Sequence, residues 1–258
     1  MLFEYGPDDF CAIAAVNDEA ILAECLAKSP DIAQGRLPLT EIRNAPSMSS
    51  AYNQGLEQTT AAICLLVHQD VYLPNGWLDK AIDLLNELSV MRPEWMVAGP
   101  YGVADDGEHV GCVWDANMQR ELGQKKFAPR MVGSLDELLL ILRRPDGFRF
   151  DADLPHFHLY GTDLVQSARA AGRSTFAVDL PVVHNNRPWH TLGGGYLDAY
   201  RYTRRKWRKK LPIHTTICSI TYNPLPLLRT RWRRRHVDRR EDYVLADARE
   251  LARLAGYE

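Results

Sequence analysis

Residues 61–78 of the chain read AAICLLVHQDVYLPNGWL, and this stretch decides the fold class. The apolar run from Ala61 to Val67 predicts a buried strand. Polar residues follow it directly, and after Pro74 and Gly76 the apolar residues recur with the spacing of one helix face. A buried strand followed by an amphipathic helix is typical of an α/β protein, in which helices cover a mainly parallel sheet.

The same alternation continues on both sides of this stretch. Residues 11–16 predict a first buried strand, and Asp18 caps the helix expected after it. Gly172 is expected to end a later helix. The remaining elements are strands expected over 38–43, 96–100 and 174–178, and helices expected over 50–58 and 163–171.

Two segments are harder to interpret from their residues. Residues 102–130 are rich in glycine and charge and predict an irregular excursion over the sheet. Residues 134–137 have the S-x-x-E form of a helix capping box, but the run from Leu138 to Leu142 is equally typical of a buried strand. Periodicity leaves both interpretations open.

Composition describes an ordinary globular chain with a sizeable core. Of its 258 residues 46% are hydrophobic and 25% are charged. Its longest apolar runs are far shorter than the roughly 20 residues of a membrane-spanning helix, and residues 1–5 lack the pattern of a secretory signal, so a cytoplasmic location is expected. The five cysteines are widely spread without a C-x-x-C pair, and they are expected to be reduced, with Cys11 and Cys64 packed in the core.

Charge is divided unevenly along the chain. Residues 1–200 hold 15 Lys and Arg against 27 Asp and Glu, whereas residues 201–258 hold 16 against 6. Seven basic residues lie between Arg201 and Lys210 and seven more between Arg229 and Arg240. The chain is therefore expected to consist of an acidic domain over 1–200 and a basic C-terminal extension over 201–258.

Polar residues follow three of the predicted strands, where ligands bind in open α/β sheets. They are Asn17–Asp18, His68–Asp70 and His184–Asn186. The carboxylate of Asp70 and the imidazole of His184 could share one divalent cation, with a nucleotide diphosphate supplying further oxygen ligands. Such a cation would neutralise charge on a leaving diphosphate.

Each of these residues also has a purely structural interpretation. An Asp after a strand is usually a turn or helix cap, and a single His is more often a surface or core residue. Asp163 opens a predicted helix, where a carboxylate caps backbone amides. The residue types alone therefore do not identify an enzyme.

The order of several short segments resembles the family-2 glycosyltransferases. The central ones are 51–55 (AYNQG), 63–71 (ICLLVHQDV) and 74–78 (PNGWL), and the branch most similar is the streptomycin-biosynthesis-type glycosyltransferase domain, in which H-Q-D stands where most relatives carry D-x-D. Residues 134–136, 141–144 and 157–164 resemble the acceptor-side stretch of the same family. The resemblance covers roughly residues 10–190.

This resemblance implies a GT-A fold, a Rossmann-like α/β sheet, and transfer of a sugar from a nucleotide-diphosphate-sugar to an acceptor hydroxyl with inversion. It implies Mn²⁺ or Mg²⁺ as cofactor. The implied residues are Asp70 and His184 as metal ligands, His68 in place of the first acid of D-x-D, Asp163 as catalytic base, and Asn17, Asn44 and Asn53 on the donor side.

The sequence departs from the family pattern at two places. His68 replaces an acid, which bears on ribose contact and metal affinity. The usual acidic pair is Gly161-Thr162-Asp163 here, which leaves one carboxylate, and Asp151 and Asp153 are the alternatives to Asp163 as base.

Partners and rival functions follow from the same features. The acceptor can be a glycan, a lipid-linked molecule or another hydroxyl compound. The basic extension can bind an anionic membrane surface, which would make the protein peripheral to the inner membrane face, or it can fold back on the acidic domain; nucleic acid is the least favoured partner, because no recognition motif accompanies the charge. The alternative functions are a nucleotide-sugar-processing nucleotidyltransferase, although residues 17–19 do not form a glycine-rich phosphate loop, and a non-catalytic binding module.

Overall fold

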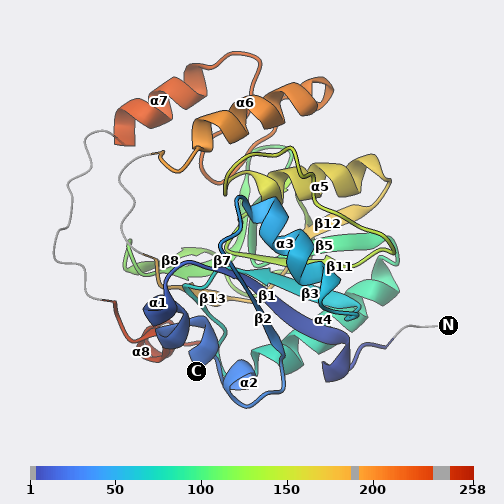
Figure 1. Cartoon of the computed structure of the whole chain (residues 1–258), viewed down its shortest axis with the longest axis vertical. Coiled ribbons are helices and arrows are strands. Elements are labelled where there is room, and N and C mark those ends of the chain that lie inside the picture. The colour runs from blue at the N-terminus through green and yellow to red at the C-terminus, as the bar shows by residue number, and fades with distance from the viewer. Residues whose placement is uncertain (1–3, 187–191, 235–244) are drawn as a thin grey trace.

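The computed structural model describes residues 4–186, 192–234 and 245–258. At its centre lies a seven-stranded sheet (Figure 1) with the strand order β2 (Leu39–Arg43), β1 (Phe10–Val16), β3 (Ile63–Val67), β11 (Leu139–Arg143), β5 (Trp95–Gly99), β12 (Ser174–Ala177) and β9 (Arg130–Met131). Five of these strands run in one direction, and β11 and β9 run against them. The predicted mixed, mainly parallel α/β sheet is confirmed.

Helices cover both faces of this sheet, which explains why β1 and β3 are apolar at every position. In β3, Leu66 packs in the cluster formed with α3 (Met48–Glu57) and α5 (Tyr160–Ala170). Its neighbour Leu65 points to the other face and packs in the cluster that contains α4 (Trp77–Met91). The carboxyl ends of β1, β2 and β3 are left free to carry polar residues.

The segment predicted to be an irregular excursion forms much of a second sheet. Its six strands are β10 (Ser134–Leu135), β6 (Tyr101–Val103), β7 (His109–Asp115), β13 (Val182–His184), β4 (Val71–Tyr72) and, paired with β7 alone, β8 (Arg120–Gly123). The prediction for residues 102–130 was therefore wrong. β6 and β7 form an antiparallel hairpin around Gly107, whose positive φ of 87° suits the tight turn after Asp106.

The structure also decides between the two interpretations of residues 134–142. Ser134 and Leu135 are strand residues, and Leu139–Arg143 is a central strand hydrogen-bonded to β3 on one side and β5 on the other. The capping-box interpretation of 134–137 as a helix start is wrong, because β10 pairs with β6 and β11 pairs with β3 and β5, and this backbone pairing outweighs the local signal. All five cysteines are free and buried, and they include Cys11 and Cys64, for which packing in the core was expected.

The basic C-terminal part of the chain is not confirmed as a separate extension. α6 (Tyr196–Lys206) crosses the boundary predicted after residue 200, and its residue Tyr200 is buried in the main core. α7 (Leu225–Arg234) follows at the same end of the molecule. α8 (Ala248–Leu254) packs instead near α1 (Glu19–Glu24), where residues of both share one buried cluster.

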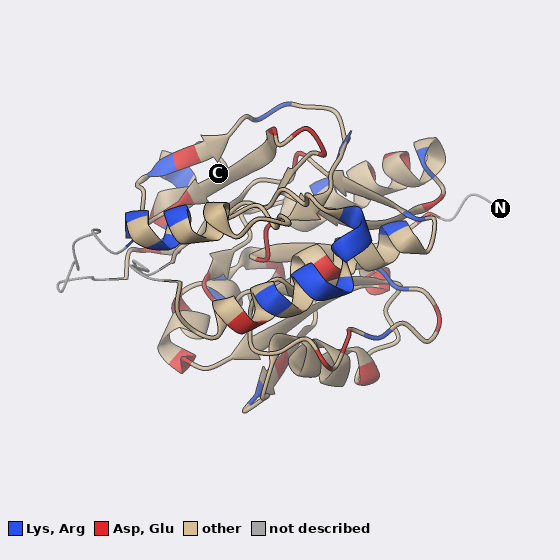
Figure 2. Ribbon diagram, turned by 90° about the horizontal axis from the view of Figure 1, so that it is seen from above, with Lys and Arg blue, Asp and Glu red and all other residues tan. Residues whose placement is uncertain are grey.

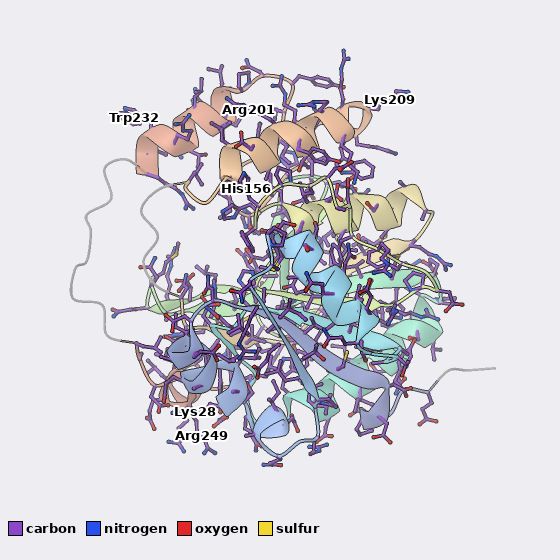
Figure 3. All side chains as sticks on the ribbon, in the orientation of Figure 1. Lys28, His156, Arg201, Lys209, Trp232 and Arg249 are labelled. Atoms are coloured by element: carbon purple, nitrogen blue, oxygen red, sulfur yellow. The ribbon has the colours of Figure 1, made fainter. Side chains whose placement is uncertain are left out.

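Lys and Arg are concentrated in α6 and α7, as the blue ribbon in Figure 2 shows. Figure 3 places Arg201, Lys209 and Trp232 at this end of the molecule, and Lys28 and Arg249 at the other. Part of the second basic run, residues 235–240, lies outside the described residues. A short helix, α2 (Pro30–Ala33), follows α1. No helix in the described part of the chain is long and apolar enough to cross a bilayer.

Candidate active site

His68, Asp70 and His184 come together because two short strands pair beyond the end of β3. The chain leaves β3 at His68 and enters β4 at Val71. β4 pairs antiparallel with β13, and this register sets His184 opposite Val71. The backbone N–H of Asn185 donates to the Asp70 carbonyl oxygen at 2.8 Å, which fixes the two segments against each other.

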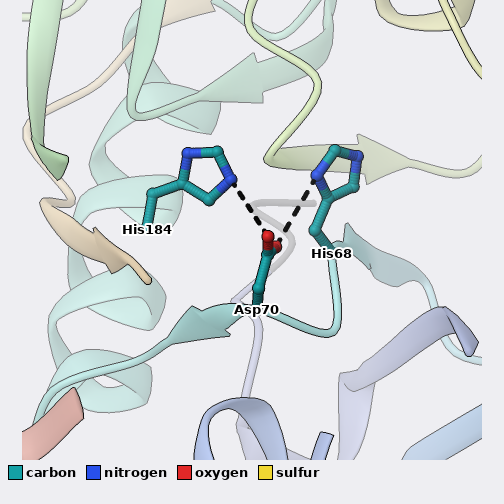
Figure 4. Close-up of side chains that lie close together, drawn as sticks. All are labelled: His68, Asp70 and His184. Atoms are coloured by element: carbon teal, nitrogen blue, oxygen red, sulfur yellow. Dashed lines mark ion pairs between the residues drawn. The ribbon is translucent and has the colours of Figure 1, made fainter. Parts of the chain in front are cut away.

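The three side chains converge on one point (Figure 4). Asp70 Oδ2 lies 3.5 Å from His184 Nε2, and Asp70 Oδ1 lies 3.9 Å from His68 Nδ1. One ligand atom from each residue lies within 4.8 Å of the other two. All three side chains are partly buried, with 19% to 28% of their surface exposed. The predicted pairing of Asp70 with His184 is thus present in space, and His68 completes a potential three-residue metal site.

The tautomer of His68 is fixed by Tyr160, the first residue of α5. The Tyr160 hydroxyl donates its hydrogen to the Glu137 carbonyl oxygen at 2.8 Å. Its oxygen therefore accepts from Nε2 of His68, which is 2.6 Å away. Nε2 then carries the ring hydrogen, and the lone pair of Nδ1 is directed toward the Asp70 side. Outer hydrogen bonds of this kind orient the imidazole ligands of metal sites.

The residues present fit a divalent cation. Asp70 Oδ1 is buried and has no hydrogen-bond partner among the described residues. A buried carboxylate oxygen without a donor is costly, and a cation supplies the missing interaction. Two imidazole nitrogens and a carboxylate are a common donor set for first-row transition metals.

The charges of the three groups are strongly coupled. Burial raises the pKa of Asp70, but the imidazoles of His184 and His68 outweigh it and bring the pKa down to about 2. Burial lowers the pKa of His184, and the Asp70 carboxylate reverses this and raises the pKa to about 9. Burial lowers the pKa of His68. His184 is therefore protonated beside the Asp70 carboxylate at neutral pH. A bound cation would displace this proton, because an imidazole ligates a metal in its neutral form.

Two of the predicted donor-side residues lie at the same edge of the sheet. β1 and β2 pair in parallel, with Val16 opposite Arg43, so Asn17 and Asn44 follow neighbouring strand ends. The side chain of Gln69, which sequence reasoning did not single out, accepts from the Asn17 backbone N–H at 3.0 Å and donates to the Asn17 side chain at 2.6 Å. Gln69 thus ties the end of β1 to the segment His68–Asp70 between β3 and β4, which we call the metal-site loop.

Asn53 is placed in a structural contact. Its side-chain amide donates to the Phe150 carbonyl oxygen at 3.0 Å and accepts from the Phe150 backbone N–H at 2.8 Å. Both ends of the amide are therefore engaged with one backbone residue. A donor contact from Asn53 stays a prediction.

Asp163 lies one turn into α5 rather than at its start. The helix begins at Tyr160, and the Glu137 side chain accepts from the Gly161 backbone N–H at 3.0 Å, so the expected start of this helix at Asp163 was wrong. The Asp163 carboxylate accepts instead from Lys206 Nζ at 2.8 Å and from Trp207 Nε1 at 2.7 Å. Only 3% of the residue is exposed. Burial raises the pKa of Asp163 more than the Lys206 ammonium lowers it.

The two alternatives to Asp163 differ in their surroundings. Asp151 accepts from the same Lys206 at 2.5 Å and from the Tyr202 hydroxyl at 2.8 Å. Asp153 is exposed, and its backbone N–H donates to the Asp151 side chain. Asp151 and Asp163 thus hold Lys206 between them.

Glu137 was missed as a site residue, although its S-x-x-E motif was noticed. Its carboxylate receives the N–H of Gly161, and a side chain at position 161 would meet the Glu137 side chain at 3.0 Å. Burial raises the pKa of Glu137 to about 8. The motif does provide a helix cap, but for α5 in another part of the chain.

The two sheets and their flanking helices form an α/β fold of the GT-A type, and a His–Asp–His cluster lies beside the carboxyl end of β3. The sequence profile described as "Glycosyltransferase like family" matches residues 11–210, and the chain belongs to this family-2-like glycosyltransferase family. The specific likeness to the streptomycin-biosynthesis branch stays a prediction.

Individual proteins similar to the chain are more distant. A protein of Fuscovulum blasticum described as "ATP synthase subunits region ORF 6" is 29% identical over 147 residues, which make up 54% of this chain and 57% of that protein. The chain thus spans little more than half the length of this relative. TarS 1–349 of S. aureus superposes with a TM-score of 0.51 at 15% identity, over 79% of this chain and 66% of that one, and shows the same fold. The mannosyltransferase PcManGT of Pyrobaculum calidifontis, in complex with GDP-Man and Mn²⁺, gives a TM-score of 0.45 at 12% identity over 70% of this chain and 59% of that one.

Proposed function

We propose that the protein transfers a hexose from a nucleotide-diphosphate-sugar to an acceptor hydroxyl, with inversion, and that His68, Asp70 and His184 hold the divalent cation that donor binding requires. The observation that carries the proposal is the geometry of this cluster. Its three ligand atoms converge, the His68 lone pair is oriented by Tyr160, and Asp70 Oδ1 lacks a donor among the described residues. Membership of a glycosyltransferase family makes a sugar nucleotide the donor class to test.

The donor set also bears on the identity of the ion. Mg²⁺ prefers oxygen ligands and retains several waters, whereas imidazole nitrogens suit transition metals. We therefore expect Mn²⁺ to bind more tightly than Mg²⁺. When bound, the cation supplies positive charge beside the leaving diphosphate.

Asn17 and Asn44 are proposed to contact the nucleoside of the donor. They follow neighbouring strands at the sheet edge that carries the cluster, and a side-chain amide can both donate and accept hydrogen bonds to a base or ribose. Gln69 keeps Asn17 beside the metal-site loop. Asn53 is the weakest donor-side candidate, because its amide is engaged with Phe150.

Asp163 remains the proposed catalytic base, which would remove the proton of the acceptor hydroxyl. Its raised pKa suits a base, but in this structure its carboxylate is covered by Lys206 and Trp207. The role therefore requires that α6 release Asp163 when the acceptor binds. A cytoplasmic location belongs to the same proposal.

Calorimetric titration with a nucleoside diphosphate, with and without Mn²⁺, tests the metal site. Asp70→Asn should abolish the metal-dependent part of nucleotide binding. Asp179→Asn is the matched control, because its side chain is 18% exposed against 21% for Asp70, and its charged partner is Lys80. Nucleotide affinity that is the same with Mn²⁺ and with a chelator would refute the proposal.

An activity assay separates the transferase from the alternative functions. Incubation with a sugar nucleotide should release a nucleoside diphosphate, slowly to water and faster with a competent acceptor. A nucleotidyltransferase would instead form or consume pyrophosphate, and a binding module would leave the donor intact.

A further inference from the structure

The stretch from Arg201 to Arg234, which includes the second half of α6 and all of α7, is basic without an acidic residue. Residues 201–234 contain eleven Lys and Arg and no Asp or Glu. Two of these basic side chains form ion pairs in the described part of the chain. Lys206 points inward to Asp151 and Asp163, and Arg201 pairs with Asp198 of its own helix. We call the outer faces of α6 and α7 the α6–α7 surface (Figure 2).

α7 has an apolar stripe on the side that faces solvent. Leu225, Leu228 and Trp232 are 52%, 51% and 65% exposed. Their spacing of three and four residues places them on one side of the helix. Leu227 points the other way, is 6% exposed and packs into the main core. The stripe is therefore not the face that holds α7 on the protein.

Arginines flank this stripe on both sides. At 100° per residue, Arg229 and Arg233 lie along one edge of the stripe and Arg231 along the other. An apolar stripe between basic edges is the pattern of a helix that lies in the interface of a bilayer. With ten residues, α7 is far too short to span one.

α6 adds a basic groove to the same surface. The groove has a volume of about 330 Å³ and is lined by Arg201, Arg204, Arg205, Arg208, Leu211 and Tyr222. Each guanidinium group offers several N–H donors to the oxygens of a phosphate group. The Tyr222 side chain at the groove is 58% exposed. The groove thus suits the phosphate of a lipid headgroup.

Exposed apolar side chains gather here more than elsewhere on the described part of the chain. Of its eleven exposed large apolar residues, five lie between Ile217 and Trp232. A polyanion such as nucleic acid could contact the arginines and the exposed aromatic rings, but it would leave Leu225 and Leu228 in water. A lipid surface satisfies both features at once.

We propose that the α6–α7 surface binds anionic phospholipid membranes, with the arginines on lipid phosphates and the α7 stripe inserted among the headgroups. This inference does not depend on the transferase assignment. Binding is expected to weaken with rising salt, because the electrostatic attraction to the surface is screened.

Vesicle flotation with the full chain tests the proposal. The probes are vesicles of phosphatidylcholine and vesicles in which part of it is replaced by phosphatidylglycerol. The protein should float only with the anionic vesicles. Arg229→Gln with Arg233→Gln should weaken the partitioning about 10- to 30-fold, since each basic residue near an anionic surface contributes a factor of about five. Leu225→Ser with Leu228→Ser should weaken it by at least about tenfold.

Matched controls come from elsewhere on the molecule. Arg92→Gln with Arg173→Gln removes two exposed arginines outside the surface, and Leu254→Ser removes a 72% exposed leucine of α8. These variants should bind as the wild type does, with circular dichroism confirming that all variants are folded. Equal flotation with both kinds of vesicle, no flotation with either, or equal losses in the controls would overturn the proposal. Undiminished binding by the Leu225→Ser, Leu228→Ser variant would also overturn it. The surface would then bind negative charge through its arginines, with no insertion of the α7 stripe into the bilayer.

Discussion

Removing one hydroxyl, in Tyr160→Phe, should weaken metal binding without removing a metal ligand. The Tyr160 oxygen holds Nε2 of His68 at 2.6 Å and thereby directs Nδ1 toward Asp70. Without it, the ring can adopt the other tautomer or rotate. Loss of an outer hydrogen bond of this kind typically lowers metal affinity 10- to 100-fold, or about 1.4 to 2.8 kcal/mol. The fold should lose about 1 to 2 kcal/mol, because the aromatic ring remains in place and the two hydrogen bonds of the hydroxyl, to the Glu137 carbonyl and to His68, are removed.

Isothermal calorimetry with Mn²⁺ measures the affinity, and urea unfolding measures the stability. Tyr200→Phe is the matched control. Its hydroxyl donates to the Ser219 carbonyl oxygen at 3.3 Å, and the residue is 1% exposed, as Tyr160 is. The two variants should lose similar stability, but only Tyr160→Phe should lose metal affinity. An unchanged Mn²⁺ affinity in Tyr160→Phe would refute the argument that Tyr160 orients a ligand.

Two further predictions concern the carboxylates around α5. Asp163→Asn should lower turnover about 10²- to 10⁴-fold at unchanged donor affinity, and it should cost only about 1 to 2 kcal/mol of stability, because Asn can still accept from Trp207 and Lys206 keeps Asp151. Near-normal turnover would make Asp163 structural and direct the search to Asp151 and Asp153. Glu137→Gln should flatten the pH dependence of the free energy of unfolding. The pKa of Glu137 rises from 4.5 to about 8 on folding, so its contribution is complete below pH 4.5 and is lost as the pH rises through 8. Parallel urea-denaturation profiles for wild type and variant would contradict this assignment.

The central strands β1, β3 and β5 of the large sheet were predictable because they are buried on both faces. The run from Cys11 to Val16 was expected as a strand, and the observed β1 adds only Phe10. β11 was not decidable locally, because what makes it a strand is its position between β3 and β5. The second sheet escaped prediction for the opposite reason: its strands are short and interrupted by glycine, and only the Asp106-Gly107 turn signalled a hairpin.

The candidate metal site could be predicted in part for the same kind of reason. His68 and Asp70 are neighbours in sequence at a strand end, so their proximity followed from the fold class. The proximity of His184 depends on the pairing of β13 with the two-residue strand β4, which leaves no pattern in the sequence. Tyr160 and Glu137 act across separate elements, and no spacing rule connects residues 68, 137 and 160.

α6 takes part in both the proposed catalytic site and the proposed membrane-binding surface. Its inner side carries Lys206, which is paired with Asp151 and Asp163, and Trp207, which follows the helix, holds Asp163 as well. Its outer side carries Arg201, Arg204 and Arg205, which line the basic groove. A base that is 3% exposed must be uncovered before it can meet an acceptor, and the segment that covers it is the one proposed to lie on the membrane. A lipid-linked acceptor would approach from that same side, so displacement of α6 at the bilayer would expose Asp163 where such an acceptor arrives.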